Sequence, residues 1–261
     1  MTIDQSIMTD LDILSLRQAI PVHCFNRSLI RSFLNLFRDL SLAVVVQYLY
    51  MGGYLHYIIY APVQGTIVFG LWVLGHECGH GAFSTYPIVN DVVGFVLHTS
   101  LLIPYFAWKK THARHHARTN HLIEGESHVP PLKKTVKEQM SIMAGKIGDP
   151  AFVIRQIFNY LVLGWLFYLF FHATGSRQSP VTKKRFKTKP NHFDPRNSEL
   201  FPDKMYFKIV LSTTGVVLAI IGLILTNMWY IYLGPYIINN AWIMLYTWLQ
   251  HTSTEVPHYG D

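Results

Sequence analysis

Cysteine and charge are both scarce in this sequence. Cys24 and Cys78 are the only two cysteines among 261 residues, too few for the disulfide framework of a small secreted domain. Only 14% of the residues are charged, against about 25% in ordinary soluble domains. With 50% hydrophobic residues and a mean hydropathy of +0.22, this composition excludes an ordinary soluble domain and predicts an integral membrane protein.

Acidic residues are fewer than basic ones, and the formal net charge is +7. In a nucleic-acid-binding protein the Lys and Arg residues form a stripe or patch. Here they flank apolar runs, so we predict no nucleic-acid partner and attribute the excess to orientation in a membrane. A cleaved signal peptide is not expected, because the first 20 residues carry acids early and lack a continuous apolar core.

Two long runs, residues 40–76 and 209–254, contain no Asp, Glu, Lys or Arg. As single helices they would be about 55 and 69 Å long, whereas the apolar core of a bilayer is about 30 Å thick. Each run must therefore fold back, the first near Pro62 and the second near Asn227. The expected fold class is an all-α integral membrane protein whose four transmembrane helices form two hairpins, at residues 40–60, 63–79, 209–225 and 228–250.

A third uncharged stretch, residues 156–176, is also long enough to cross a bilayer. The polar segments on its two sides are about equally rich in Lys and Arg, and such segments prefer the cytoplasm. We therefore expect this stretch to lie in the membrane interface, together with residues 92–103, which are too few to span. Every large polar segment then faces the cytosol, within a single domain covering residues 1–261.

Histidine is abundant, with 14 residues, and five of the histidines fall in two clusters. "GHECGHG" places His76 and His80 four positions apart, and "THARHHARTNH" places His112, His115 and His116 at i, i+3 and i+4. On a helix each set projects from one face, and neutral imidazole is a ligand for iron and zinc. Both clusters adjoin apolar helices on the predicted cytosolic side, so we predict that these five histidines bind metal.

Other polar residues near these clusters receive different predictions. His251 ends the last apolar run as His76 ends the first, which makes His251 a further candidate ligand. Glu77 is expected to hydrogen-bond a ligating imidazole, because metal-bound histidines usually donate their second N–H to a carboxylate or carbonyl. Loop polarity explains His121 and His128 more simply than metal binding, and packing explains His56, His98 and His172.

An alternative function is open at this point. "HECGH" also fits H-E-x-x-H, in which two histidines hold zinc and the glutamate activates water in a metalloprotease. That signature does not account for the second cluster of three histidines, because a hydrolytic zinc site needs three protein ligands and an open position. Five or more imidazoles suit two redox-active metals better, and iron serves oxygen chemistry.

Several segments together resemble a known family. "AIPVHCFNRSLIRSF", "HECGHGAFS", "LLIPYFAWKKTHARHH", "EGESHVP" and "LQHTSTEVPHY" occur in the order of the landmarks of membrane fatty acid desaturases, and the chain is identified as resembling the delta-12 and omega-3 acyl desaturase branch. The resemblance implies a non-haem di-iron centre that uses O2 and two electrons to place a cis double bond in an acyl chain. It assigns His76 and His80 to the first histidine box, His112, His115 and His116 to the second, and His251 to an additional ligand.

The resemblance also implies partners and a location. The substrate would be a fatty acyl lipid or acyl thioester, the electron donor a b-type cytochrome or ferredoxin, and the membrane that of the endoplasmic reticulum, with the histidine boxes facing the cytosol. Beyond the metal ligands it implies no separate catalytic residue.

The chain departs from the family at its end. The family carries a third box, H-x-x-H-H, and the only such pattern here is the second box itself, before the chain stops at Asp261. We therefore expect a fragment with little activity of its own. A non-catalytic regulatory membrane subunit is the alternative outside enzymes.

Overall fold

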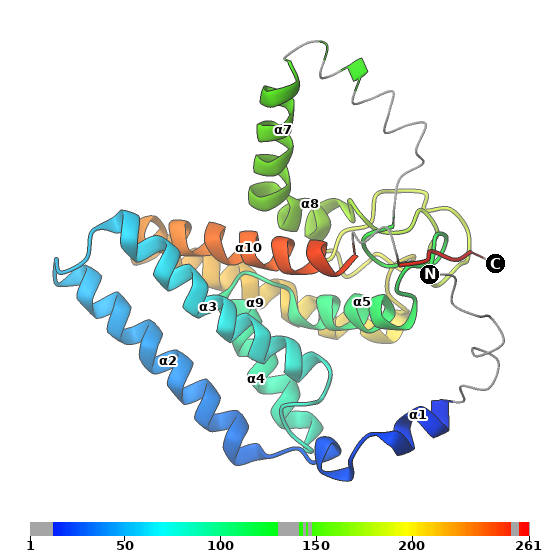
Figure 1. Ribbon diagram of the computed structural model, residues 1–261, viewed down its shortest axis with the longest axis horizontal. Helices are drawn as coiled ribbons and strands as arrows, with labels where there is room; N and C mark the ends of the chain where they lie inside the picture. Colours follow the sequence, from blue (N-terminus) through cyan, green and yellow to red (C-terminus); the bar gives the residue numbers. More distant parts are fainter. Residues whose placement is uncertain (1–12, 130–140, 143–144, 146–147, 252–255, 261) are drawn as a thin grey trace.

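The computed structural model describes residues 13–129, 141–142, 145, 148–251 and 256–260, and within these residues it is helical without strands (Figure 1). Two isolated bridges, His121 with Tyr259 and Gln178 with Arg185, are the only extended pairings in the part described. The α-helices are α1 (Ile13–Ala19), α2 (Leu29–Met51), α3 (Tyr57–Gly79), α4 (Pro87–Ser100), α5 (Tyr105–Ala117), α7 (Asp149–Phe158), α8 (Gly164–Phe171), α9 (Tyr206–Leu225) and α10 (Trp229–His251). Shorter elements are two 3-10 turns (Val22–Phe25 and Asp203–Met205) and a π-helical turn (Asn159–Leu163) that joins α7 to α8.

Helices α2 and α3 form the first hairpin, with the turn earlier than predicted. The chain reverses at Gly52 and Gly53, where Gly53 adopts a φ of 78° that favours glycine. Pro62 lies inside α3, so the predicted turn at this residue is wrong. The physical reason is that Pro62 lies in the second turn of the helix, where its missing N–H removes only one backbone hydrogen bond. The helix boundaries predicted at residues 40, 60 and 63 are therefore wrong, and the observed helices are Leu29–Met51 and Tyr57–Gly79.

Helices α9 and α10 form the second hairpin, and its turn is where the sequence predicts it. Thr226 caps α9, and Asn227 takes the left-handed conformation with a φ of 54°. The Asn227 Oδ1 atom accepts a hydrogen bond of 3.1 Å from Trp229 Nε1, which ties the turn to the start of α10. Asparagine tolerates positive φ better than most residues, so the residue type alone was sufficient to predict the position of this turn.

By length and composition, three helical stretches in the described part of the chain could cross a membrane: Tyr57–Gly79, Asp149–Phe171 and Asp203–Leu225. Helices α4 and α5 meet the same measure only as a pair, and they are bent by 106° at the break between them. The protein is thus an all-α integral membrane protein. Helices α2 and α10 do not meet this measure, so the arrangement of four spans in two hairpins stays a prediction.

The stretch expected to lie in the interface consists of α7, the π-helical turn and α8. Its length and apolarity would allow it to span, yet Figure 1 shows α7 running across the direction of α10 rather than alongside it. Helix α7 also exposes Ile154 and Phe158. Its interfacial position is therefore still a prediction, which the orientation in Figure 1 favours.

The largest core cluster lies where α3, α5, α8 and α10 meet, and aromatic rings dominate it. Trp72 of α3, Trp108 of α5 and Trp165 of α8 are all buried, and the Trp72 ring meets the other two edge-on at centroid distances of 6.0 and 6.4 Å. Aromatic packing of this kind fixes ring orientation as well as burying area. The core therefore holds α5 against the end of α3, on the right of Figure 1.

Candidate metal centre

Four imidazoles from two helices converge at the end of α3. His76 and His80 come from the last turn and cap of α3, and His112 and His116 come from one face of α5. The Nε2 atom of His112 is 2.8 Å from that of His76, 3.0 Å from that of His80 and 3.1 Å from that of His116. All four ligand atoms lie within 4.8 Å of one another. We call this set the first histidine group.

The spacing within the first histidine group fits a metal ion. A metal held at ~2.1 Å by imidazole nitrogens separates neighbouring ligand atoms by about 3.0–3.4 Å, the edge of an octahedron or tetrahedron. Four of the six pairwise Nε2 separations in the group are 2.8–3.2 Å, close to that edge. Burial lowers the pKa of His80 to about 4, so its ring is neutral near pH 7 with a free lone pair for a metal.

Helix α5 is positioned by what lies beneath its histidines. The Trp108 ring stacks on the His112 imidazole at 4.5 Å with an interplanar angle of 16°. Gly79 allows this approach, because a Cβ at that position would be 2.8 Å from Trp108 Cζ3. The start of α5 is held to α9 by the Phe106 N–H, which donates to Ser212 Oγ at 2.9 Å. Packing therefore fixes where the imidazoles point.

Glu77 contacts a histidine of the first group, as predicted. Its Oε1 atom is 3.1 Å from His76 Nδ1, while His76 Nε2 faces the other imidazoles. A carboxylate at Nδ1 places the proton there and leaves Nε2 free as an acceptor. The role of Glu77 as an orienting residue remains a prediction.

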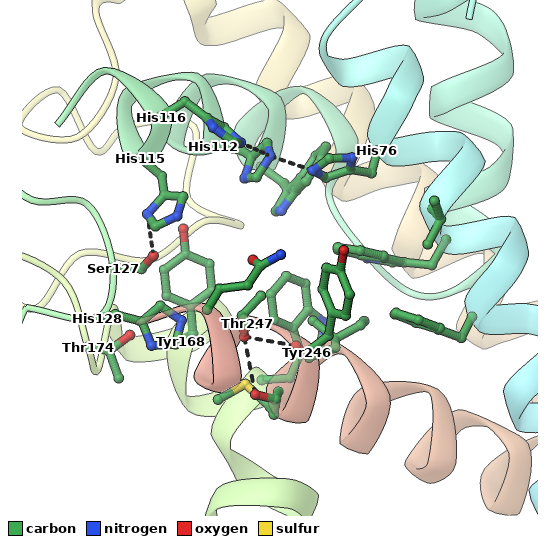
Figure 2. Close-up of a pocket in the computed structure, with 18 of the residues that line it drawn as sticks. His76, His112, His115, His116, Ser127, His128, Tyr168, Thr174, Tyr246 and Thr247 are labelled. Carbon is green, nitrogen blue, oxygen red and sulfur yellow. Dashed lines mark hydrogen bonds between the residues drawn. The ribbon is translucent and has the colours of Figure 1, made fainter. Parts of the chain in front are cut away.

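A second set of imidazoles lies beside the first group on the same face of α5, toward the end of α10. The His115 Nε2 atom is 3.1 Å from His251 Nε2 at the end of α10, and the His251 ring stacks on that of His128 at 4.7 Å. Ser127 Oγ lies 2.9 Å from His115 Nδ1. We call His115, His128 and His251 the second histidine group. Figure 2 shows His76, His112 and His116 in one row and His115, Ser127 and His128 beside it.

Sequence reasoning assigned His128 to a polar loop, and the structure instead places it in the second histidine group. His128 adopts a φ of 56°, and its ring is 6.3 Å from His115. Burial lowers the pKa of His128 to about 4, and that of His115 to about 3. No local spacing relates His128 to either helix, so only the folded loop reveals it.

The other histidines lie apart from both groups. His121 is buried in the loop after α5, where its Nδ1 accepts the backbone N–H groups of Ile123 and Glu124, each at 3.1 Å. His98 is buried under the first group and stacks on Trp72. His56 caps the start of α3. These observations agree with the structural roles expected for His56, His98 and His121.

A separate buried polar set fixes the loop that carries Ser127 and His128. Glu126 is fully buried, with Oε2 3.3 Å from Arg114 Nη1 and Oε1 3.3 Å from His172 Nδ1. Arg114 also donates to the backbone oxygen of Glu124 at 2.9 Å. Burial raises the pKa of Glu126 to about 8, against the opposing effect of Arg114. His172, expected to be a packing residue, therefore has a polar partner. Because Arg114 lies between His112 and His115, this pair ties the loop to the ligand-bearing helix.

A cavity of about 300 Å³ opens directly onto the histidines (Figure 2). Four of the five predicted box histidines line it, as do His128 and Ser127. Its remaining wall is largely aromatic and aliphatic, contributed by Phe69, Trp72, Trp108, Trp165, Tyr246, Ile243 and Met244. The combination of metal-ligand side chains at one end and an apolar wall suits a long apolar substrate.

Similarity to known proteins identifies the family of this chain. The profile of the fatty acid desaturase family matches residues 52–260. The chain belongs to the fatty acid desaturase family. The family implies an iron cofactor, and the first histidine group is able to hold a metal ion. This match does not support the alternative of a zinc metalloprotease.

Individual relatives of this desaturase-family chain have related names. It is 37% identical to a delta(12) fatty acid desaturase of Calendula officinalis, over 94% of this chain and 65% of the relative. It is 38% identical to a delta(12) acyl-lipid conjugase of Impatiens balsamina, over 94% and 64%. It is 33% identical to an oleate hydroxylase of Claviceps purpurea, over 96% and 59%. The chain thus spans 59–65% of the length of these relatives, which is less than two thirds.

Proposed function

We propose that this chain carries the iron-binding and substrate-binding core of an acyl-lipid desaturase, which introduces a cis double bond into a fatty acyl chain with O2 and two electrons. The observation that carries the proposal is the pair of histidine groups that meet along one face of α5, both facing one apolar cavity. Family membership and the names of the relatives support the same reaction class.

Two irons would be held by separate histidine groups. The first would bind to His76, His80, His112 and His116, and the second to His115, His128 and His251. When bound, the irons would supply O2 activation and the oxidising power to remove two hydrogens from an unactivated acyl chain. His115 and His116 are adjacent on α5, with ring centroids 5.5 Å apart, so one helix would carry ligands for both metals.

The protein residues orient the ligands and the substrate. Glu77 and Ser127 contact the Nδ1 atoms of His76 and His115, which leaves the Nε2 atoms available for metal. The aromatic walls from Phe69 and Trp72 exclude water and confine the acyl chain beneath the histidines. A confined chain presents one methylene pair to the metals, and this is how position on the chain is selected.

The membrane arrangement follows from the same proposal. Helices α2, α3, α9 and α10 would form four spans, and their histidine-bearing ends would face the cytosol at the endoplasmic reticulum. Both hairpin turns lie at the far end of the molecule from α5 in Figure 1, which supports this orientation. An external carrier, a b-type cytochrome or ferredoxin, would deliver electrons from the cytosolic side.

The test combines metal analysis with product analysis. Residues 1–261, purified from membranes, are assayed for iron and zinc. The same residues joined to the remaining third of the Calendula officinalis relative are expressed in yeast, and cellular fatty acids are profiled. We expect iron in both proteins and a new double bond from the chimera, with low activity from residues 1–261 alone because further ligands are implied by the family. Zinc alone, with no new product across varied acyl substrates, would overturn the proposal.

A further inference from the structure

A cluster of buried polar side chains adjoins the loop that carries Ser127 and His128, and it belongs to neither histidine group. Glu126, His172 and His192 each offer one ligand atom, and these atoms lie within 4.8 Å of one another. None of the three residues is more than 4% exposed. Polar and charged groups buried this deeply require partners. We call these three residues the buried cluster.

Several ligand atoms of the buried cluster have no hydrogen-bond partner within the described residues. These atoms are Glu126 Oε1 and both ring nitrogens of His172. Glu126 Oε1 lies 3.3 Å from His172 Nδ1, yet this contact does not have the geometry of a hydrogen bond. Buried polar atoms without partners are uncommon in proteins, and several of them at one place indicate a bound ion or water.

His192 is held in a single tautomer. Its Nδ1 atom lies 3.1 Å from the Leu169 oxygen, which can only accept, so the ring proton is on Nδ1 and the lone pair is on Nε2. Burial lowers the pKa of His192 to about 4, so the ring is neutral near pH 7. His192 Nε2 lies 3.2 Å from Thr111 Oγ1, whose one proton is also within reach of the Trp108 oxygen at 3.0 Å. The lone pair that a metal ion requires is therefore present.

The number of acceptors in the buried cluster favours a cation over water. An ionised Glu126 accepts through Oε1, and a neutral His172 and His192 each accept through one ring nitrogen. A water molecule can donate only two hydrogen bonds, whereas a cation is bound by all three acceptors at once. The Glu126 Oε1 to His172 Nδ1 distance of 3.3 Å also equals the edge of a tetrahedron of ligands at ~2.0–2.1 Å from zinc.

Contacts outside the cluster orient its ligands. Glu126 Oε2 lies 3.3 Å from Arg114 Nη1, which fixes the carboxylate and leaves Oε1 for a metal ion. His172 has a left-handed φ of 51°, and its N–H donates to the Tyr168 oxygen at 2.8 Å. Gly175 makes room for the His172 ring, because a Cβ at position 175 would overlap it. The ligands are thus positioned by the fold before any ion binds.

The enclosure of the buried cluster distinguishes zinc from iron. Two histidines and one carboxylate also bind iron in oxygenases, where several positions stay open for O2 and substrate. Here Thr111 and Arg114 contact the cluster, and its members are almost fully buried. A closed site with nitrogen and oxygen ligands is typical of structural zinc.

The buried cluster joins segments that have little regular structure. Glu126 lies in the loop after α5, His172 directly follows α8, and His192 lies in the connection toward α9. Residues 172–202 contain no helix in the described structure. A metal ion can fix such segments, because its binding free energy contributes to folding.

We propose that Glu126, His172 and His192 bind a structural zinc ion, which fastens the loop of Ser127 and His128 to the connection after α8. The site is separate from the iron proposed for the two histidine groups. It goes beyond the proposed function, because its ligands and its effect on the loop do not depend on the reaction that the chain catalyses.

The test counts metal ions and does not depend on turnover. Residues 1–261 are purified from membranes of cells grown with zinc and iron, and both metals are measured per chain by plasma mass spectrometry. We expect about one zinc ion per chain. X-ray absorption at the zinc edge should show nitrogen and oxygen ligands, two of them imidazoles, at ~2.0–2.1 Å. This spectrum is recorded on the unmutated chain, so it tests the site even where a variant fails to fold.

Paired variants locate the zinc ion. Glu126→Gln and His192→Gln each remove one ligand of the buried cluster. The controls are Glu124→Gln and His121→Gln, which change a carboxylate and a buried histidine outside the cluster. We expect the ligand variants to lower zinc by about five-fold or more and the controls to retain it. His112→Ala, which should lose iron, should also retain its zinc.

The outcomes separate this inference from the proposed function. A chain without zinc above background, equal loss of zinc in ligand and control variants, or four imidazoles around the zinc would each overturn the site. Loss of iron instead of zinc from Glu126→Gln would overturn it as well. About one zinc ion per chain, bound through the buried cluster of a protein that holds no iron, would leave the site standing and count against the desaturase proposal.

Discussion

His115 and His251 lie 136 positions apart in the sequence and place their Nε2 atoms 3.1 Å apart in the fold. One belongs to the short helix α5 and the other to the last turn of α10. Two neutral, half-buried imidazole nitrogens at this distance repel each other unless a proton or a cation lies between them. The contact therefore links the end of α10 to the ligand helix in a way that metal binding would strengthen.

Removing His112 should abolish iron binding by the first histidine group. Its Nε2 is the only one in hydrogen-bonding range of all three other members in the described structure. We expect His112→Ala to lose at least about half of the bound iron, measured by plasma mass spectrometry on purified protein. His56→Ala, at the opposite end of α3, is the control and should keep it. Unchanged iron in His112→Ala would contradict the assignment.

His128 provides a test of the second histidine group that sequence spacing alone did not suggest. We expect His128→Ala to lower iron by about half while leaving the first group occupied, because within the described residues the ring contacts of His128 are with His251 and His115 and with no member of the first group. The exposed His23→Ala serves as the matched control. If iron content is the same in both variants, His128 is a packing residue.

Close packing under α5 makes a small residue necessary at position 79. A side chain in Gly79→Val would collide with Trp108, whose ring supports His112. Overpacking of this kind costs about 1–3 kcal/mol, and here we also expect weaker iron binding. Thermal unfolding in detergent and iron analysis measure the two effects. Gly222→Val is the control, since no atom lies within 4 Å of its added Cβ.

Acidification should destabilise the metal-free protein before it reaches pH 4. Burial lowers the pKa of His192 to about 4, from 6.5 for an exposed histidine. Between these two values the unfolded chain binds the proton and the folded chain does not, so stability falls as the pH is lowered. A shift of this size corresponds to about 3 kcal/mol.

Thermal unfolding of the metal-free protein between pH 7 and pH 4 checks this expectation. The neutral variant His192→Gln removes the titrating group, so its melting temperature should depend less steeply on pH than that of the original chain. His258→Gln, an exposed position, should retain the original slope. Identical slopes for all three proteins would show that His192 does not titrate on unfolding.

Local rules predicted part of the fold well. The turn at Asn227 and the bounds of α10 follow from the end of an apolar run and a residue that tolerates positive φ. The turn near Pro62 failed for a reason that is also local: the two glycines at 52 and 53 make a better reversal, and a proline near the start of a helix is tolerated. A single residue such as Pro62 therefore does not show where the helix breaks, because the position depends on whether a nearby segment forms a better turn.

The sequence by itself determined the helical, membrane-embedded class and the two helical faces of histidines, because hydrophobic run length and the 3.6-residue period act within a few turns of one chain segment. Only the tertiary structure decided how these faces are shared: four imidazoles form one group, while His115 joins His251 and His128. That division depends on how α5 packs against α3, α4 and α9 and on the buried pairing of Glu126 with Arg114. Such contacts join residues far apart in the chain, and no local periodicity specifies them.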